Sequence, residues 1–286
     1  KESSGIAVRS ASDRTIHVTK DDVPASELIA SPAYRTFLDT ALQPAFAAGQ
    51  RELAVIAHSR LVTNGTQEHN FNNQPCIKDG LVMVHNGIVT NVDALWAKYA
   101  GRIERKYEVD TEVIAALFRL FLLEGLGPVG AIRRVFNEME GAASVAVLIN
   151  DARQVLLATN TGSLYTVQDG SGSLVFASEA YIARTFTKQA SVRDRFADKA
   201  VQWLQPFTGK VIDLESWSVA DFGLKEAAPD FALKATEPFT ITDHSTGAGQ
   251  KVVPAMATSD EGRLRKLIVF PEDVMRNIRR CTRCLL

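Results

Sequence analysis

The chain has 286 residues, of which 46% are hydrophobic and 23% charged, and its formal net charge is −1. This composition is typical of a folded domain with a sizeable core and excludes a disordered chain. The near-neutral charge favours a small substrate and predicts neither nucleic acid nor membrane as a partner. Three cysteines are too few for a disulfide framework. No uncharged apolar stretch reaches the ~18 residues of a membrane span, so we expect a cytoplasmic protein.

The pattern of apolar residues predicts strands first, then helices, then hairpins. Two helices are predicted at about Thr111–Glu124, with Asp110 as N-cap, and at about Val129–Met139. This order favours an α+β layered sandwich over a doubly wound fold, which would alternate strand and helix. Six short runs of apolar and β-branched residues, several bounded by Asn, Asp or Gly, are the predicted strands: 53–57, 81–84, 144–149, 154–158, 164–167 and 174–177.

The C-terminal quarter has a different composition. After about Ser216 the apolar periodicity weakens, so we expect one domain over 1–216 and a linker over 217–262. The stretch 263–286 regains apolar residues among many arginines and predicts a helix that begins a following domain. Within it, Cys281 and Cys284 have the spacing of half a zinc site, and the sequence leaves open whether they bind metal.

A polar cluster follows the predicted strand 53–57 and contains Arg60, Thr63 and Asn64. The planar fork of Arg60 suits a ligand carboxylate, and Thr63 can add a hydroxyl. The alternative is that Arg60 pairs with an acidic residue for structural reasons.

Two further clusters add complementary chemistry. Asn86-Gly87 predicts either a type I′ hairpin turn or a pair of donors, side-chain amide and backbone N–H, for a developing oxyanion. Asp110 either caps its helix or receives a ligand ammonium. Arg60 and Asp110 together would hold the two charges of an amino acid, with Asn86 and Gly87 left for a side-chain carbonyl.

Two patterns are expected to carry no chemistry. The glycines of residues 125–130 match a dinucleotide fingerprint by letters, but they follow a helix rather than a strand, which indicates an interhelical turn. The histidines His58, His69 and His85, with Cys76, match no common zinc spacing and are expected to be structural.

Four motifs, in order, resemble the class II, or N-terminal-nucleophile, glutamine amidotransferases, including the glutaminase domain of glucosamine-6-phosphate synthases. They are KESSGIAV at 1–8, AHSRLVTNG at 57–65, VHNGIV at 84–89 and VDTEVI at 109–114. The resemblance covers about residues 1–216. It implies an αββα four-layer sandwich of two antiparallel sheets between helices, and hydrolysis of L-glutamine to glutamate and ammonia.

The resemblance also assigns residues. Arg60 and Thr63 would bind the glutamine α-carboxylate, Asp110 the α-ammonium, and Asn86 with the Gly87 N–H the oxyanion. The family's nucleophile is an N-terminal cysteine that precedes the segment matching Lys1. We therefore expect this cysteine, with the first strand and helix, upstream of the chain shown.

Some positions depart from the family pattern. Leu61 and Asn64 replace an aromatic residue and a histidine of the synthase, and Cys76 cannot be the nucleophile because it has no free α-amine. The alternative function is therefore a non-catalytic regulatory or interaction module that binds glutamine.

The tail, RRCTRCLL, resembles the opening of ATP-pyrophosphatase-type sugar amidotransferase domains of bacterial surface-polysaccharide synthesis. This implies a downstream synthetase domain that uses ATP and Mg²⁺, whereas the glutaminase domain would need no cofactor. A phosphosugar isomerase domain is the alternative partner.

Overall fold

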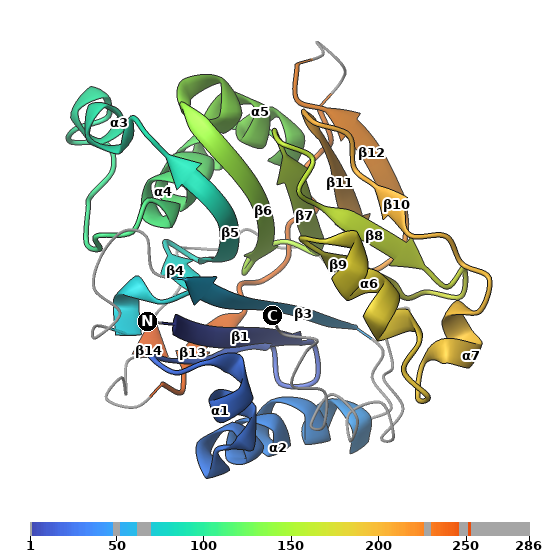
Figure 1. The fold of residues 1–286 in the computed structure, drawn as a ribbon. Coiled ribbons are helices and arrows are strands. Elements are labelled where there is room, and N and C mark those ends of the chain that lie inside the picture. Colours follow the sequence, from blue (N-terminus) through green and yellow to red (C-terminus); the bar gives the residue numbers. More distant parts are fainter. Residues whose placement is uncertain (1, 48–51, 62–69, 226–229, 246–250, 253–286) are drawn as a thin grey trace.

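The computed structural model describes residues 2–47, 52–61, 70–225, 230–245 and 251–252, and two stacked β-sheets form its centre (Figure 1). The first sheet has the strand order β14 (Lys251–Val252), β13 (Thr240–Asp243), β2 (Thr15–Asp21), β1 (Glu2–Ser10) and β3 (Leu53–Leu61). The second has the order β12 (Val219–Gly223), β11 (Thr208–Asp213), β7 (Gln154–Thr159), β6 (Gly141–Ile149), β5 (Leu81–Val89) and β4 (Cys76–Lys78). Among these described strands only β13 and β2 pair in parallel.

Helices cover the outer faces of both sheets. Helices α1 (Ala25–Ala30) and α2 (Pro32–Ala47) pack on the first sheet, and α4 (Thr111–Leu123) and α5 (Pro128–Glu138) pack on the second, with α3 (Val92–Lys98) beside α4. A small sheet of β10 (Gln202–Trp203), β8 (Tyr165–Gln168) and β9 (Leu174–Ala177) carries α6 (Ala180–Thr187) and α7 (Arg193–Phe196) nearby. A 3₁₀ turn, η1, spans Asn70–Asn72.

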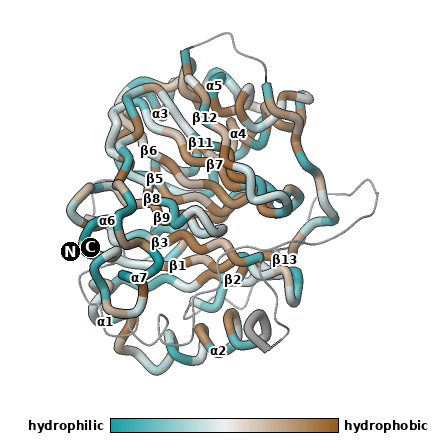
Figure 2. Tube along the Cα trace, turned by 90° about the vertical axis from the view of Figure 1, so that its right-hand side faces the viewer, coloured by the Kyte–Doolittle hydropathy of each residue, from teal (hydrophilic) through white to brown (hydrophobic). Residues whose placement is uncertain are grey.

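Buried apolar residues form three large clusters, one in each space between these layers. Figure 2 shows hydrophobic residues along the central strands. Val82 and Leu148 lie between the two sheets, whereas Met83 and Phe118 lie between the second sheet and its helices. Neighbouring residues of β5 thus face different layers, because successive side chains of a strand point to opposite faces. The αββα sandwich expected from the sequence is confirmed.

The predicted helices and hairpins are found at their expected places. Helix α4 buries Val113, Leu117, Phe118 and Phe121 completely, and α5 begins at Pro128, whose missing N–H costs nothing in the first turn. Strands β6 with β7, and β8 with β9, form the expected antiparallel hairpins.

The glycines between α4 and α5 allow a distant segment to approach the start of α5. The Asp230 carboxylate accepts hydrogen bonds from the N–H groups of Gly127 and Gly130, both at 2.7 Å. A Cβ on Gly127 would lie 1.8 Å from the backbone oxygen of Phe231. These residues therefore form an interhelical turn capped by a carboxylate, not a nucleotide site.

The segment expected to be a linker, 217–262, contains β12, β13 and β14. Phe222 is 6%, Phe239 3% and Ile241 1% exposed, so these described residues are part of the sandwich. Its apolar periodicity is weak because β12, β13 and β14 are short strands, in which few side chains face the core. Residues 263–286, with Cys281 and Cys284, lie outside the described residues.

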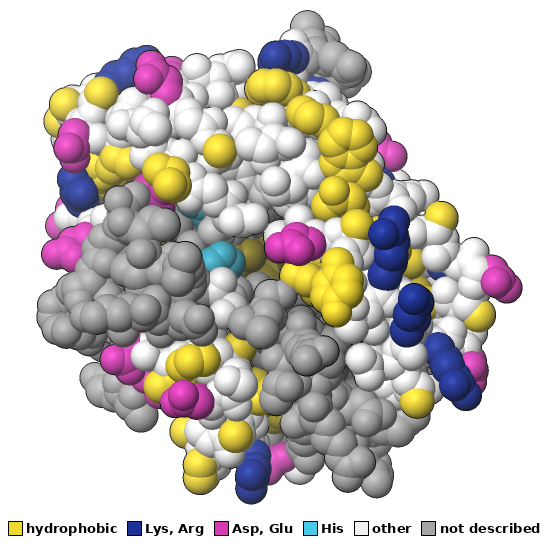
Figure 3. Space-filling view, in the orientation of Figure 1, with side chains coloured by type: hydrophobic (Ala, Val, Ile, Leu, Met, Phe, Trp, Pro, Cys, Tyr) yellow, Lys and Arg dark blue, Asp and Glu magenta, His cyan; other side chains and the backbone are white. Residues whose placement is uncertain are grey.

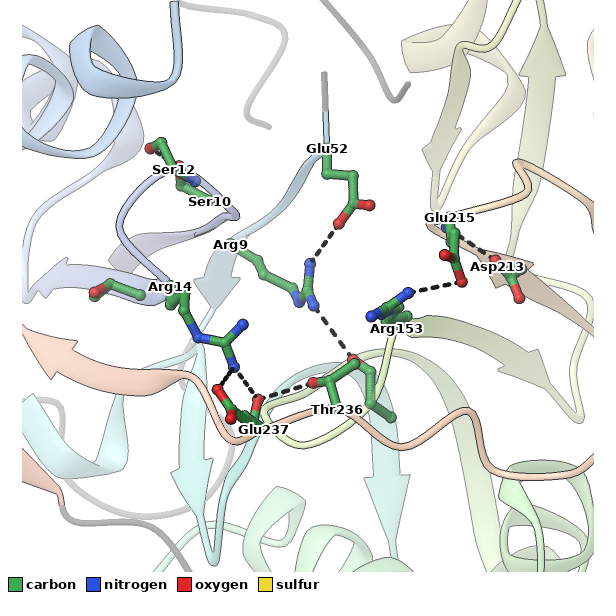
Figure 4. A network of polar contacts seen from close by, with 12 residues as sticks. Arg9, Ser10, Ser12, Arg14, Glu52, Arg153, Asp213, Glu215, Thr236 and Glu237 are labelled. Carbon is green, nitrogen blue, oxygen red and sulfur yellow. Dashed lines mark hydrogen bonds and ion pairs between the residues drawn. The ribbon is translucent and has the colours of Figure 1, made fainter. Parts of the chain in front are cut away.

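A network of charged side chains ties this segment to the two sheets (Figure 4). Arg9, 1% exposed, donates to the Ala152 backbone oxygen at 3.4 Å, lies 3.9 Å from the Glu52 carboxylate and stacks over the Phe239 ring at 3.8 Å. Burial lowers the pKa of Arg9 to about 10, so it stays charged at neutral pH. Arg14 donates to the Glu237 backbone oxygen at 2.7 Å, a second contact to the stretch that precedes β13.

Within the described part of the chain, no helix is long and apolar enough to cross a membrane.

Replacing Asp230 with Ala should lower the free energy of unfolding by about 1 kcal/mol, because two N–H groups at the start of α5 lose their acceptor. Urea denaturation measures the change. Glu104→Ala is the control, since this side chain is 77% exposed and its ion pair is with nearby Lys106. Equal stabilities of the two variants would show that Asp230 does not cap α5.

Candidate active site

Strand β5 runs straight through Asn86-Gly87. Asn86 pairs with Ser144 and Gly87 with Ala143 of β6, and pairing continues to Val89. The type I′ turn is therefore ruled out. Asn86 and Gly87 are exposed while His85 on one side is buried, so the strand presents the Asn86 side chain and the Gly87 backbone at its accessible end.

Gly87 adopts a backbone conformation that requires glycine. Its φ is 143°, and a Cβ would lie 2.0 Å from the backbone oxygen of Ala142. Side-chain atoms are excluded from this position by β6 itself. The glycine also leaves its backbone open to a ligand, as an oxyanion-binding N–H requires.

Asp110 occupies the N-cap position of α4, but its carboxylate makes no capping hydrogen bond. Instead, its Oδ2 accepts the Val89 N–H at 3.0 Å, and its Oδ1 lies 3.7 Å from Nδ1 of His85. The capping role suggested by the sequence is thus incorrect, because the side chain turns towards β5. This contact brings Asp110 next to the strand that carries Asn86 and Gly87.

The surroundings of Asp110 favour its charged form. Burial raises the pKa of this carboxyl, but the nearby His85 imidazole and the Val89 N–H outweigh burial and hold the pKa below its ordinary value. Asp110 is only 7% exposed and ionised at neutral pH. An ionised carboxylate with little access to water is suited to bind a ligand ammonium.

A buried ion pair fixes the loop that leads into Asp110. Glu112, which is 0% exposed, lies 2.9 Å from Nζ of Lys78 and accepts the N–H groups of Lys106 and Tyr107 at 2.8 and 2.7 Å. These three contacts hold the loop that leads into Asp110. The motif residue Glu112 therefore has a structural role.

The remaining predicted binding residues are placed only in part. The Arg60 backbone lies in β3 opposite Ser3 of β1. Its side chain, together with Thr63 and Asn64, lies outside the described residues, so their assignments stay predictions.

Figure 3 shows histidine side chains in a depression at the centre of the face seen in Figure 1, bordered by apolar and acidic side chains.

Cys76 is unsuited to be a nucleophile. It is 0% exposed, and burial raises the pKa of its thiol to about 12, although Lys20 acts in the opposite direction. A thiol with such a pKa carries almost no thiolate at neutral pH. Within the described ranges, no group of three or more His, Cys, Asp or Glu side chains is arranged to hold a metal ion.

Sequence reasoning missed two residues near this site. Gln74 contacts the backbone of His85, and Lys20 contacts the backbone on both sides of Gln74. Neither lies in a motif, and both contacts join segments far apart in the chain. The structural feature that marks Lys20 is its burial, which a single sequence does not reveal.

Comparisons with known proteins find similar chains. Residues 58–184 match a family described as glutamine amidotransferase domain. A glutamine–fructose-6-phosphate aminotransferase (isomerizing) of Caulobacter vibrioides is 35% identical over 136 residues, which are 47% of this chain and 22% of that protein. The protein of the same name from Shouchella clausii is 26% identical over 278 residues, 91% of this chain and 44% of that one. This chain therefore spans less than half the length of these relatives.

Two solved structures share the fold. A glutamine phosphoribosylpyrophosphate amidotransferase from B. subtilis superposes with a TM-score of 0.51 at 15% identity, covering 78% of this chain and 43% of that chain. A structure described as the allosteric regulatory enzyme of purine biosynthesis has a TM-score of 0.52 at 16% identity, covering 79% and 43%.

Replacing Gly87 with Ala should lower the free energy of unfolding by about 2 kcal/mol or more, because the added methyl group meets the Ala142 carbonyl in a strained backbone. Gly101→Ala is the matched control: its φ is also positive, at 79°, but no atom lies within 4 Å of the added Cβ. Chemical denaturation compares them. Equal losses would mean that β6 does not exclude a side chain at Gly87.

Replacing Asp110 with Asn should remove a stabilisation that depends on pH. Because the folded-state pKa is below the ordinary value, the charge of Asp110 stabilises the fold fully above about pH 4. This contribution is lost as pH falls through the folded-state pKa. The stability difference between the two proteins should therefore shrink with acidification, and a difference that grows would contradict the assignment.

Proposed function

We propose that this chain, which carries a glutamine amidotransferase domain of the class II type, hydrolyses L-glutamine to glutamate and ammonia for use by an acceptor. The observation that carries the proposal is the contact between Asp110 and Val89. It joins an ionised carboxylate to the strand that presents Asn86 and Gly87. One site thereby offers a counter-charge for an ammonium and donors for a carbonyl oxygen.

The glutamine would be held at three points. Asp110 binds its α-ammonium, and Arg60 binds its α-carboxylate with Thr63 and Asn64 beside it. The side-chain amide carbonyl then points to Asn86 and Gly87, whose Nδ2–H and backbone N–H stabilise the negative charge that develops on the oxygen during attack. Binding both charges of the amino acid fixes the amide relative to the attacking group.

The attacking group in this proposal is a thiolate. We propose the N-terminal cysteine that the family resemblance places before Lys1, with its own α-amine as the base. Its sulfur attacks the amide carbon, ammonia leaves with a proton from that amine, and water hydrolyses the resulting glutamyl thioester. Buried Cys76 takes no part, since its thiol is protonated and enclosed.

We also propose that the ammonia passes to a downstream domain of the same protein, whose start lies in 263–286, and that this domain activates the acceptor with ATP and Mg²⁺. The resemblance of the tail supports this proposal. Because β12, β13 and β14 belong to the two sheets, we propose that the glutaminase domain extends past Ser216 and that the linker follows Val252.

Replacing Arg60 or Asp110 with Ala in the full-length protein should lower kcat/KM for glutamine hydrolysis by about 10- to 100-fold, because each removes a charge-assisted contact to the substrate. Release of glutamate and ammonia provides the assay, and Arg35→Ala, exposed on α2, is the control. Glutamine binding without hydrolysis by the full-length protein and its acceptor would contradict the proposal and indicate a binding module.

A further inference from the structure

His85 lies between Asp110 and the Asn86-Gly87 pair, and a side chain holds its backbone where a neighbouring strand would. The ladder between β4 and β5 begins at Cys76 opposite Met83. Two residues further along β5, the side chain of Gln74 takes the place of a strand: its Nε2 donates to the His85 backbone oxygen at 2.9 Å, and its Oε1 accepts the His85 N–H at 2.6 Å. A primary amide has the same donor and acceptor groups as a peptide, so it can end the ladder.

Gln74 is itself held by a buried lysine. Nζ of Lys20 donates to the backbone oxygens of Asn73 and Pro75, at 2.9 and 3.0 Å, on either side of Gln74. Lys20 is 3% exposed. Burial lowers its pKa, although Asp243 acts in the opposite direction. The position of the Gln74 amide is therefore set by contacts within the first sheet and the turn before β4.

The imidazole of His85, 2% exposed, lies between β6 and the start of α4. Its Nε2 is 3.3 Å from the Ala142 backbone oxygen, and because a carbonyl only accepts, Nε2 is the donor in this contact. Its Nδ1 faces Oγ1 of Thr111 at 3.4 Å and Oδ1 of Asp110 at 3.7 Å. The ring thus fills the space behind the Asp110 carboxylate and limits where that carboxylate can point.

We propose that His85 is a positioning residue for both halves of the glutamine site. Its backbone, held by the Gln74 amide, fixes the peptide group that leads into Asn86-Gly87. Its ring, held between Ala142 and Thr111, fixes the orientation of Asp110. The inference rests on the proposed glutamine site. The His85 ring orients the carboxylate that binds the ammonium, whereas the Gln74 amide positions the strand that carries the oxyanion donors.

Steady-state kinetics of the full-length protein separate these roles. The two substrates are glutamine and the mono-amide of glutaric acid, which has the same amide and a carboxylate but no α-ammonium. His85→Gln keeps a group near Nε2 and loses Nδ1, so it should raise KM for glutamine about tenfold, change kcat by less than about threefold, and leave KM for the mono-amide unchanged. His85→Asn, whose amide nitrogen lies near the position of Nδ1, should restore most of the glutamine affinity.

Gln74→Leu should instead lower kcat for both substrates by about tenfold, since the oxyanion donors serve either amide. Gln74→Glu keeps the acceptor for the His85 N–H but loses the donor, so its kcat should lie between those of the unmodified protein and Gln74→Leu. It is the second variant if Gln74→Leu does not fold. Gln43→Leu, exposed on α2, is the control. Equal effects of His85→Gln on the two substrates, or a Gln74 effect confined to KM, would overturn the proposal.

A measurement without substrate distinguishes failure of this inference from failure of the proposed function. The chain has five histidines, and the His85 imidazole nitrogens can be assigned in ¹⁵N NMR spectra by their loss in His85→Gln. Asp110→Asn should shift the Nδ1 resonance of His85 and leave Nε2 in place. If Nδ1 does not respond, the ring does not position Asp110, whether or not the protein hydrolyses glutamine.

Discussion

The candidate site depends on β5 remaining a strand through Asn86-Gly87, where the sequence alone permits a turn. Two contacts keep it extended: the ladder with β6 on one side, and the hydrogen bond from the Val89 N–H to Asp110 just beyond. If the chain turned at Gly87, the Asn86 amide and the Gly87 N–H would serve the turn and would not be available to a ligand. The same carboxylate that holds the strand is also the counter-charge expected for the substrate ammonium, so strand geometry and substrate recognition are coupled at one residue.

The rest of the sandwich provides a rigid support for this strand. Apolar layers lie on both faces of the second sheet, so β5 cannot shift without opening two cores. At the end of the sandwich shown in Figure 4, buried Arg9 of the first sheet donates to the Ala152 backbone oxygen and stacks over the Phe239 ring. Removing Glu52 would leave the buried charge of Arg9 without its partner. The contacts of Phe239 with Arg9 and of Glu237 with Arg14 make these residues part of the folded unit.

Sequence patterns predicted the elements whose stability comes from regular apolar spacing. Helices α4 and α5 and the central strands were predicted close to their bounds, because one face of each is almost entirely apolar. Features that depend on distant contacts were not predicted: Asp110 faces Val89 instead of capping α4, and the segment expected to be a linker contributes strands β12 and β13 to the two sheets. Gln74 and Lys20 act through side chains that bond to backbone groups of other segments, and no local pattern marks such contacts.

The central claim is that Asp110, Asn86 and Gly87 surround one glutamine. The most direct test is a crystal structure of the full-length protein after reaction with a diazo-ketone analogue of glutamine. We expect the ligand α-ammonium within hydrogen-bonding distance of the Asp110 carboxylate and its carbonyl oxygen at the Asn86 Nδ2 and Gly87 N–H. A ligand bound elsewhere, or bound here with its ammonium pointing away from Asp110, would contradict the account.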